Sequence, residues 1–242
     1  MKICSDIIPD TKTGFPIWKR MLDVSLVILA LPVLIPVTLL IAAIIRLVSK
    51  GPILFKQERI GRGGQKFVCF KFRTMHVGAE SVSHQGHLHH LIHSDAPMTK
   101  MDAHGDKRII PFGVFLRATG LDELPQLINV VRGEMSLVGP RPCLPYEFEQ
   151  YLPWQRERCA AAPGLTGLWQ VSGKNKTTFT QMIRLDIEYS QRCNLMLDLE
   201  IIVRTVPTLL LQVVDTSKKK AVAAKTIAVQ TETILSARVV NH

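Results

Sequence analysis

A run of 22 residues without a charged side chain, from Val24 to Ile45, constrains the fold of this chain more than any other feature. About 20 apolar residues suffice for a helix to cross the hydrocarbon core of a bilayer. The run begins too far into the chain for a cleavable signal peptide, exceeds the usual apolar core of one, and lacks a small-residue cleavage site before Arg46. We therefore expect residues 17–50 to stay in the membrane.

Two features of this run argue against a straight crossing. Pro32 and Pro36 lie four residues apart near its middle, and each removes a helical hydrogen bond and crowds the preceding turn. Basic residues flank both ends, with Lys19 and Arg20 before the run and Arg46 and Lys50 after it. A crossing helix normally shows a charge bias, whereas a helix that breaks and returns keeps both flanks on the cytoplasmic side. We expect a re-entrant helix hairpin with its break at the prolines, and a kinked spanning helix is the alternative.

The charge balance narrows the class of partner. Lysine and arginine outnumber aspartate and glutamate by 30 to 20, so the formal charge is +10. Beside a membrane segment, this surplus favours membrane lipid or phosphorylated small molecules as partners. Few aromatic residues interleave the basic ones, so we expect no nucleic-acid partner. The five cysteines form no CxxC pair, which is the usage of a reduced compartment.

Residues 51–214 are expected to form one compact α/β domain that is mainly helical. GPILFKQERIG predicts a short strand that leads into the glycine-rich turn at 61–64. KFVCFKFRTM at 66–75 alternates apolar and basic residues, as a half-buried strand does. MSLVG at 135–139 predicts a third short strand, closed by the turn PRP.

Three segments of this domain have helical patterns. In residues 121–133 apolar side chains recur at helical spacing, Asp122 is a good N-cap and Gly133 supplies the stop. Residues 145–161 and the apolar stretch 199–214 are candidates for amphipathic helices in the membrane interface. An ordinary surface helix explains 145–161 equally well.

The remaining segments are polar or basic. Residues 1–16 form an N-terminal extension, and residues 215–242 form a basic tail that can touch anionic lipid. Residues 76–107 predict a long surface loop. Within it, five histidines could converge on a metal ion, although their irregular spacing favours a polar surface insertion: His84, His87, His89, His90 and His93.

The adjacent acids Asp122 and Glu123 are the strongest candidates for chemistry. A carboxylate at the start of a helix can attack phosphorus or hold a divalent cation, and two in sequence can divide those tasks. The plain alternative is an ordinary cap followed by an acid in the first turn. Cationic side chains that could gather around the pair and bind a diphosphate are Lys71, Arg73, Arg117 and Arg141.

Three long motifs in this chain resemble those of one family. FKQERIGRGGQKFVCFKFRTM, LDELPQLINVVRGEMSLVGPRP and PGLTGLWQVSGKN occur in the same order in the bacterial sugar transferases. These are small monotopic polyprenyl-phosphate phosphoglycosyl transferases that begin exopolysaccharide or O-antigen synthesis. The resemblance covers roughly residues 17–212.

The resemblance implies a mechanism and a location. The aspartate matching Asp122 attacks the β-phosphate of a UDP-sugar and releases UMP, and polyprenyl (undecaprenyl) phosphate then takes the sugar phosphate from the aspartyl intermediate. It further implies Mg²⁺ as cofactor, help from the residue matching Glu123, and a further acid near the site at Asp198. The catalytic domain rests on the cytoplasmic face of the bacterial inner membrane, beneath a re-entrant helix whose break best matches Pro36.

The chain departs from the family's pattern at the break, because Ile35 stands where relatives often have serine and Pro32 adds a second proline. Two rival functions are open. One is a membrane-tethered basic module without catalysis, and the other is a glycosyl transferase that releases UDP. The transferred sugar and the oligomeric state, including a possible homo-oligomer, are not fixed by these motifs.

Overall fold

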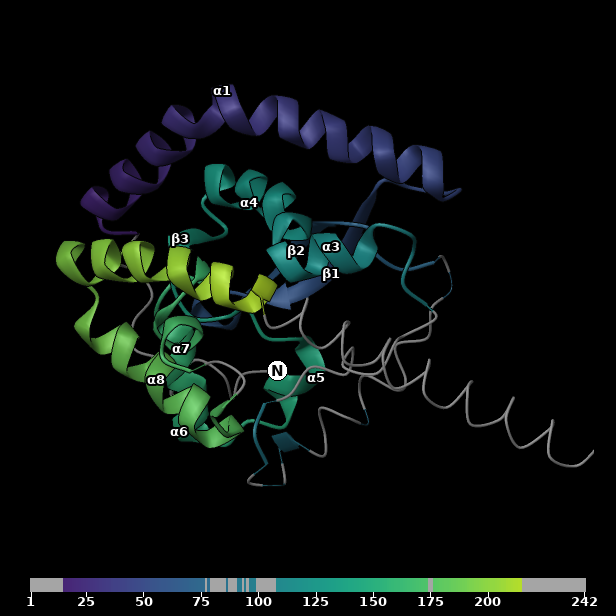
Figure 1. Ribbon diagram of the computed structural model, residues 1–242. Coiled ribbons are helices and arrows are strands. Elements are labelled where there is room, and N and C mark those ends of the chain that lie inside the picture. Colours follow the sequence, from purple (N-terminus) through teal and green to yellow (C-terminus); the bar gives the residue numbers. More distant parts are fainter. Residues whose placement is uncertain are drawn as a thin grey trace, which may run out of the picture.

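In this computed structural model, most of the chain between residues 15 and 214 is described, and its elements are mainly helical (Figure 1). The expected N-terminal extension (but for residues 15 and 16), the basic tail 215–242 and the five clustered histidines lie outside the described residues, so these predictions stay open. The described residues are 15–76, 78, 86, 91–92, 94, 96–98, 108–173 and 176–214.

The apolar run forms one long helix, α1 (Ile17–Val48), which is the only described helix long and apolar enough to cross a membrane. Both Pro32 and Pro36 lie inside it, and the helix continues through them. Figure 1 shows α1 as a bent arc along one side of the molecule. The expected two-armed hairpin is therefore not seen within α1. Each proline removes one hydrogen bond and bends the axis, and prolines four residues apart bend it toward the same side.

Both ends of α1 pack on the same domain. In its first half, Lys19 and Asp23 near the start are buried, and Val27 is buried in a cluster with Val130. Near its end, Ile41 and Ile45 are buried in a cluster with Leu116. The middle of the helix instead exposes large apolar side chains, among them Leu29, Val33, Ile35, Leu39 and Leu40.

Two small sheets form the β part of the domain. Strands β1 (Leu54–Ile60) and β2 (Lys66–Phe72) pair antiparallel across a short 3₁₀ turn, η1 (Arg62–Gly64). Gly63 has a φ of 67°, which glycine adopts without steric cost. Strands β3 (Ser136–Val138) and β4 (Gly164–Thr166) pair in parallel. The predicted strands are confirmed, although β2 ends at Phe72 and not at residue 75.

The predicted helix at 121–133 consists of two parts. Residues Leu121–Gln126 form a 3₁₀ segment, η3, and the α-helix α4 (Leu127–Arg132) follows. Pro125 explains the division, because it cannot donate a hydrogen bond to the preceding turn. The expected N-cap role of Asp122 is wrong, since Gly120 precedes the element and Asp122 lies within its first turn. Gly133 ends α4 with a left-handed conformation, as predicted.

The other helices surround these sheets. The expected helix at 145–161 is broken into three short pieces, because Pro153 starts a new element. A helix over 195–214 contains the apolar stretch 199–214. The remaining bounds are α3 (Gly113–Thr119), α5 (Pro145–Glu149), α6 (Pro153–Arg156), η4 (Glu157–Ala160), α7 (Leu168–Val171) and α8 (Phe179–Arg192).

Helix α8 carries much of the largest core cluster. Thr178 caps its start, where the hydroxyl accepts from the backbone N–H of Gln181. Met182 and Ile183 are fully buried, and they pack with Tyr151 and Trp169. The helix over 195–214 exposes a row of apolar side chains: Met196, Leu199, Val203, Val206, Leu209, Leu210, Leu211 and Val214.

Candidate active site

The centre of the site is the acidic turn of η3. Lys71 Nζ, near the end of β2, donates to Glu123 Oε1 at 2.7 Å, and both side chains are partly exposed. Asp122 is partly exposed beside this pair. Leu121 and Leu124, on either side of the two acids, pack against the cluster that contains Ile41 and Ile45 of α1. The acidic turn therefore lies next to the second half of the apolar helix.

One buried amide fastens α4 to β2. Asn129 accepts from the backbone N–H of Phe70 at 3.2 Å and donates to the carbonyl of Val68 at 2.7 Å. The side chain of Asn129 thus satisfies one donor and one acceptor on the free edge of β2, as a neighbouring strand would. Because Lys71 follows Phe70 directly, this amide helps to set the position of Lys71 relative to Glu123.

The four expected cations have different partners in the structure. Arg73 is buried and donates to the carbonyls of Ser49 and Lys50 at 2.9 and 2.7 Å, so it holds the end of α1. Arg117, in α3, lies within 3.4 Å of the Thr74 hydroxyl. Lys71 pairs with Glu123 of the acidic turn, whereas the Arg73 guanidinium donates to backbone carbonyls beyond the end of α1.

Arg141 lies at the other end of the β1–β2 hairpin. It belongs to the turn PRP, whose next residue Cys143 bridges to Ile60 at the end of β1. Lys71 pairs with Phe55 at the opposite end of β1. Five residues separate positions 55 and 60, which corresponds to about 17 Å along a strand. Two cationic positions therefore lie at the two ends of one hairpin.

Asp198 has a different environment from the one expected. It is fully buried, with Lys19 Nζ at 2.5 Å and the Tyr189 hydroxyl at 2.7 Å. Among the described residues, no group of three histidine, cysteine, aspartate or glutamate side chains could hold a metal ion. The expected metal group of Asp122, Glu123 and Asp198 is therefore not assembled, because Asp198 is paired with the start of α1.

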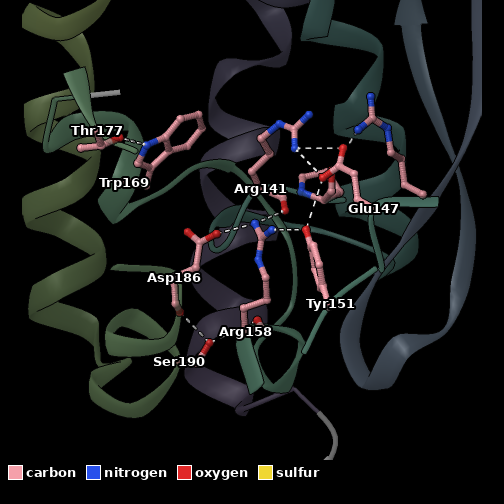
Figure 2. A network of polar contacts seen from close by, with 10 residues as sticks. Arg141, Glu147, Tyr151, Arg158, Trp169, Thr177, Asp186 and Ser190 are labelled. Carbon is pink, nitrogen blue, oxygen red and sulfur yellow. Dashed lines mark hydrogen bonds and ion pairs between the residues drawn. The ribbon is translucent and has the colours of Figure 1, made fainter. Parts of the chain in front are cut away.

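A buried polar network carries residues that the sequence patterns did not single out. Figure 2 shows Arg141, Glu147, Tyr151, Arg158 and Asp186 linked in a chain of hydrogen bonds and ion pairs. One signal in the sequence could have indicated it: Asp186 falls on the apolar face of α8, where a charge requires a buried partner.

Electrostatics in this network depend on burial and on the three nearby guanidinium groups. Burial raises the pKa of the Glu147 carboxyl, but Arg141, Arg59 and Arg158 outweigh it and hold that pKa below the ordinary value. Burial raises the pKa of Asp186 to about 6, and its ion pair with Arg158 offsets only part of this effect. Glu147 is therefore ionised at neutral pH.

Comparison with known proteins places the chain in a family. The model of the family described as bacterial sugar transferase matches residues 15–212. This chain belongs to that family. The sugar transferase is 39% identical over 193 residues to the exopolysaccharide production protein ExoY of Sinorhizobium fredii, a match that covers 80% of this chain and 85% of ExoY.

Two further relatives have names that state a reaction. A UDP-glucose:undecaprenyl-phosphate glucose-1-phosphate transferase of Caulobacter vibrioides is 41% identical over 210 residues, which are 84% of this sugar transferase and 73% of the relative. An undecaprenyl-phosphate galactose phosphotransferase of Salmonella typhimurium is 39% identical over 166 residues, which are 66% and 34% of the two chains. The names differ in the sugar, so the similarity alone does not fix the donor.

Proposed function

We propose that this sugar transferase moves a hexose-1-phosphate from a UDP-sugar to undecaprenyl phosphate, the first membrane step of exopolysaccharide or O-antigen synthesis. One observation carries the proposal: the partly exposed acids Asp122 and Glu123 lie beside Lys71 in a turn that packs against the apolar helix α1. A nucleophile at this place is next to the bilayer that holds a lipid acceptor. The names of the relatives support the same reaction.

The chemistry proceeds in two displacements on one phosphorus. A carboxylate oxygen of Asp122 forms a bond to the β-phosphorus, the bond from that phosphorus to the bridging oxygen breaks, and UMP leaves with that oxygen. A phosphate oxygen of the polyprenyl phosphate then attacks the same phosphorus, and the carboxylate of Asp122 is regenerated. Such a covalent step lets the soluble donor and the lipid acceptor react in turn. Lys71 offsets the charge of Glu123 and of the donor phosphates.

Magnesium fits this site only together with a substrate. Mg²⁺ is usually bound through one or two carboxylates plus substrate phosphates and water, so Asp122 and Glu123 suffice as its protein ligands. No third acid among the described residues joins them. When bound, Mg²⁺ neutralises charge on the diphosphate. Asp198 is not part of this proposal.

The proposed location is the cytoplasmic face of the bacterial inner membrane. Because both ends of α1 pack on one domain, a helix crossing the bilayer would have to pull one end away from its buried contacts. We infer that α1 enters one leaflet with its exposed middle and returns, as a bent helix and without a sharp hairpin. The apolar row of the helix over 195–214 would then rest in the membrane interface.

The decisive experiment measures the nucleotide product. Purified full-length protein, undecaprenyl phosphate, Mg²⁺ and a panel of UDP-sugars should yield UMP, separated from UDP by chromatography. Asp122→Asn should abolish UMP release, whereas the exposed control Glu58→Gln should retain it. UDP as the product would indicate direct glycosyl transfer, and full turnover by Asp122→Asn would rule out the covalent aspartyl intermediate. Mass spectrometry of protein incubated with donor alone should find the sugar phosphate on the peptide containing Asp122.

A further inference from the structure

The turn Pro140–Arg141–Pro142 is held at each of its backbone carbonyls. The carbonyl of Pro140 accepts from the backbone N–H of Gly164 at 2.8 Å. The carbonyl of Arg141 accepts from Arg158 Nη2 at 2.8 Å, and that of Pro142 accepts from Arg59 Nη1 at 3.0 Å. Two prolines already restrict this backbone, so its conformation is fixed before any ligand binds.

The side chain of Arg141 is held in the same way. Its Nη1 lies 3.2 Å from Glu147 Oε2, and Glu147 is completely buried whereas a quarter of the Arg141 side chain is exposed. Tyr151 donates its hydroxyl to Glu147 at 3.3 Å and accepts from Arg158 at 2.7 Å. Arg158 in turn pairs with the buried Asp186. Figure 2 shows this chain running from Arg141 to Asp186.

The charges of this group do not cancel. Three guanidinium groups, on Arg59, Arg141 and Arg158, face two carboxylates, on Glu147 and Asp186, which leaves one positive charge in excess. Arg59 and Arg158 are buried, so Arg141 is the member of this trio that reaches solvent. A rigid arginine with excess positive charge behind it suits a phosphate group, whose oxygens match the planar fork.

We infer that Glu147 is a positioning residue that orients the Arg141 guanidinium toward a phosphate of the donor. The inference rests on the proposed function, which supplies the phosphate-bearing donor. Glu147 does not touch the substrate, because its side chain is completely buried. Glu147 acts on the ligand only through its ion pair with Arg141. Because Arg141 is the exposed member of the group, the excess positive charge of the group faces the ligand.

Binding of inorganic diphosphate to the full-length protein in detergent micelles tests this inference without turnover. We expect Arg141→Ala and Glu147→Gln each to weaken diphosphate affinity by about tenfold to a hundredfold, the worth of a charge-assisted hydrogen bond. Removing the negative charge of Glu147 would by itself strengthen the binding of an anion, so a loss of affinity in Glu147→Gln reports the lost orientation of Arg141. The double variant should bind no more weakly than Arg141→Ala, because Glu147 acts only through Arg141. The matched control is Glu149→Gln, an exposed acid two residues away in α5, which should bind as the wild type does.

Other results would overturn the inference. Wild-type affinity in Glu147→Gln, multiplied losses in the double variant, or no diphosphate binding by the wild type would each do so. If Glu147→Gln does not fold, Tyr151→Phe replaces it, since it removes one hydroxyl, which donates to Glu147 and accepts from Arg158, and should weaken binding about threefold. UMP release measured on the same proteins separates the two proposals. If the Arg141 and Glu147 variants show the expected non-additive loss of diphosphate affinity but the wild type releases no UMP, only the proposed function is contradicted. If the wild type releases UMP but the two variants show no such non-additivity, only the role of Glu147 is contradicted.

Discussion

The ammonium of Lys19 lies 2.5 Å from a carboxylate oxygen of Asp198, across 179 positions of the sequence, and both side chains are buried. The Tyr189 hydroxyl joins the pair, accepting from Lys19 at 2.8 Å and donating to Asp198 at 2.7 Å. This contact fastens the start of α1 to the helix over 195–214. The two helices with exposed apolar rows are thereby held to one another.

Removing only one partner of the Lys19–Asp198 pair should lower the free energy of unfolding by several kcal/mol. Lys19→Met leaves a buried carboxylate without its counter-charge, which typically costs about 3–5 kcal/mol. Replacing both residues, as Lys19→Met with Asp198→Leu, should recover most of that loss. Denaturant unfolding in micelles measures it, and Arg192→Met, which breaks the exposed pair with Glu188, should cost less than about 1 kcal/mol.

The same pair predicts that Asp198 does not bind magnesium. The concentration of Mg²⁺ that gives half-maximal UMP release should be unchanged, within about twofold, in Asp198→Asn, because its carboxylate is occupied by Lys19 and Tyr189. The measurement is a Mg²⁺ titration at a temperature where the variant stays folded. A tenfold higher requirement would show that Asp198 belongs to the metal site after all.

Two variants of Asn129 should separate its two contacts with β2. Asn129→Ala removes both partners of the strand edge and should cost about 2–4 kcal/mol, since a backbone donor and acceptor lose their hydrogen bonds. Asn129→Asp is combined with Glu134→Gln, because the Asn129 amide also donates to the Glu134 carboxylate at 2.6 Å and two carboxylates there would repel each other. This aspartate variant can still accept from Phe70 but cannot donate to Val68. Amide hydrogen exchange should therefore find the Phe70 N–H protected in the aspartate variant and exposed in the alanine variant. Equal protection in both would contradict this geometry.

Stability should fall in mild acid through Glu147. Its pKa in the folded protein lies below the ordinary value of 4.5, because three guanidinium groups outweigh the effect of burial. A lowered folded pKa contributes stability above the unfolded pKa, and that contribution is lost as the pH falls through the folded value. The unfolding free energy of the wild type should drop below about pH 4.5 more steeply than that of Glu147→Gln. Parallel curves would mean that Glu147 is not held as a carboxylate by these arginines.

The two ends of α1 should label from the same side of the membrane. Ile17 and Leu47 are 79% and 85% exposed, so a cysteine at either position should not disturb the core. In a background without Cys4 and Cys193, Ile17→Cys and Leu47→Cys should both react with a membrane-impermeant maleimide only after the cytoplasmic face is opened. Labelling of one position in intact cells would instead indicate a crossing helix. The same background without an added cysteine controls for labelling of the buried Cys69, Cys143 and Cys159.

Local patterns in the sequence predicted much of this molecule. The apolar run predicted a long helix, the alternation at 66–75 predicted β2, and Gly133 predicted the end of α4, because each depends on residues close in the chain. The motifs also predicted the family that the comparison shows. The division at Pro125 and the broken segment at 145–161 could have been read from the prolines.

Partners of the charged side chains were decided by the tertiary structure. The sequence by itself determined that Arg73, Arg141 and Asp198 are charged, and that the apolar helix precedes them. Only the folded structure brings Arg73 into contact with the end of α1, pairs Asp198 with Lys19, and places three arginines near Glu147. A buried charge needs a counter-charge at hydrogen-bonding distance, and which distant residue supplies it depends on how the helices pack.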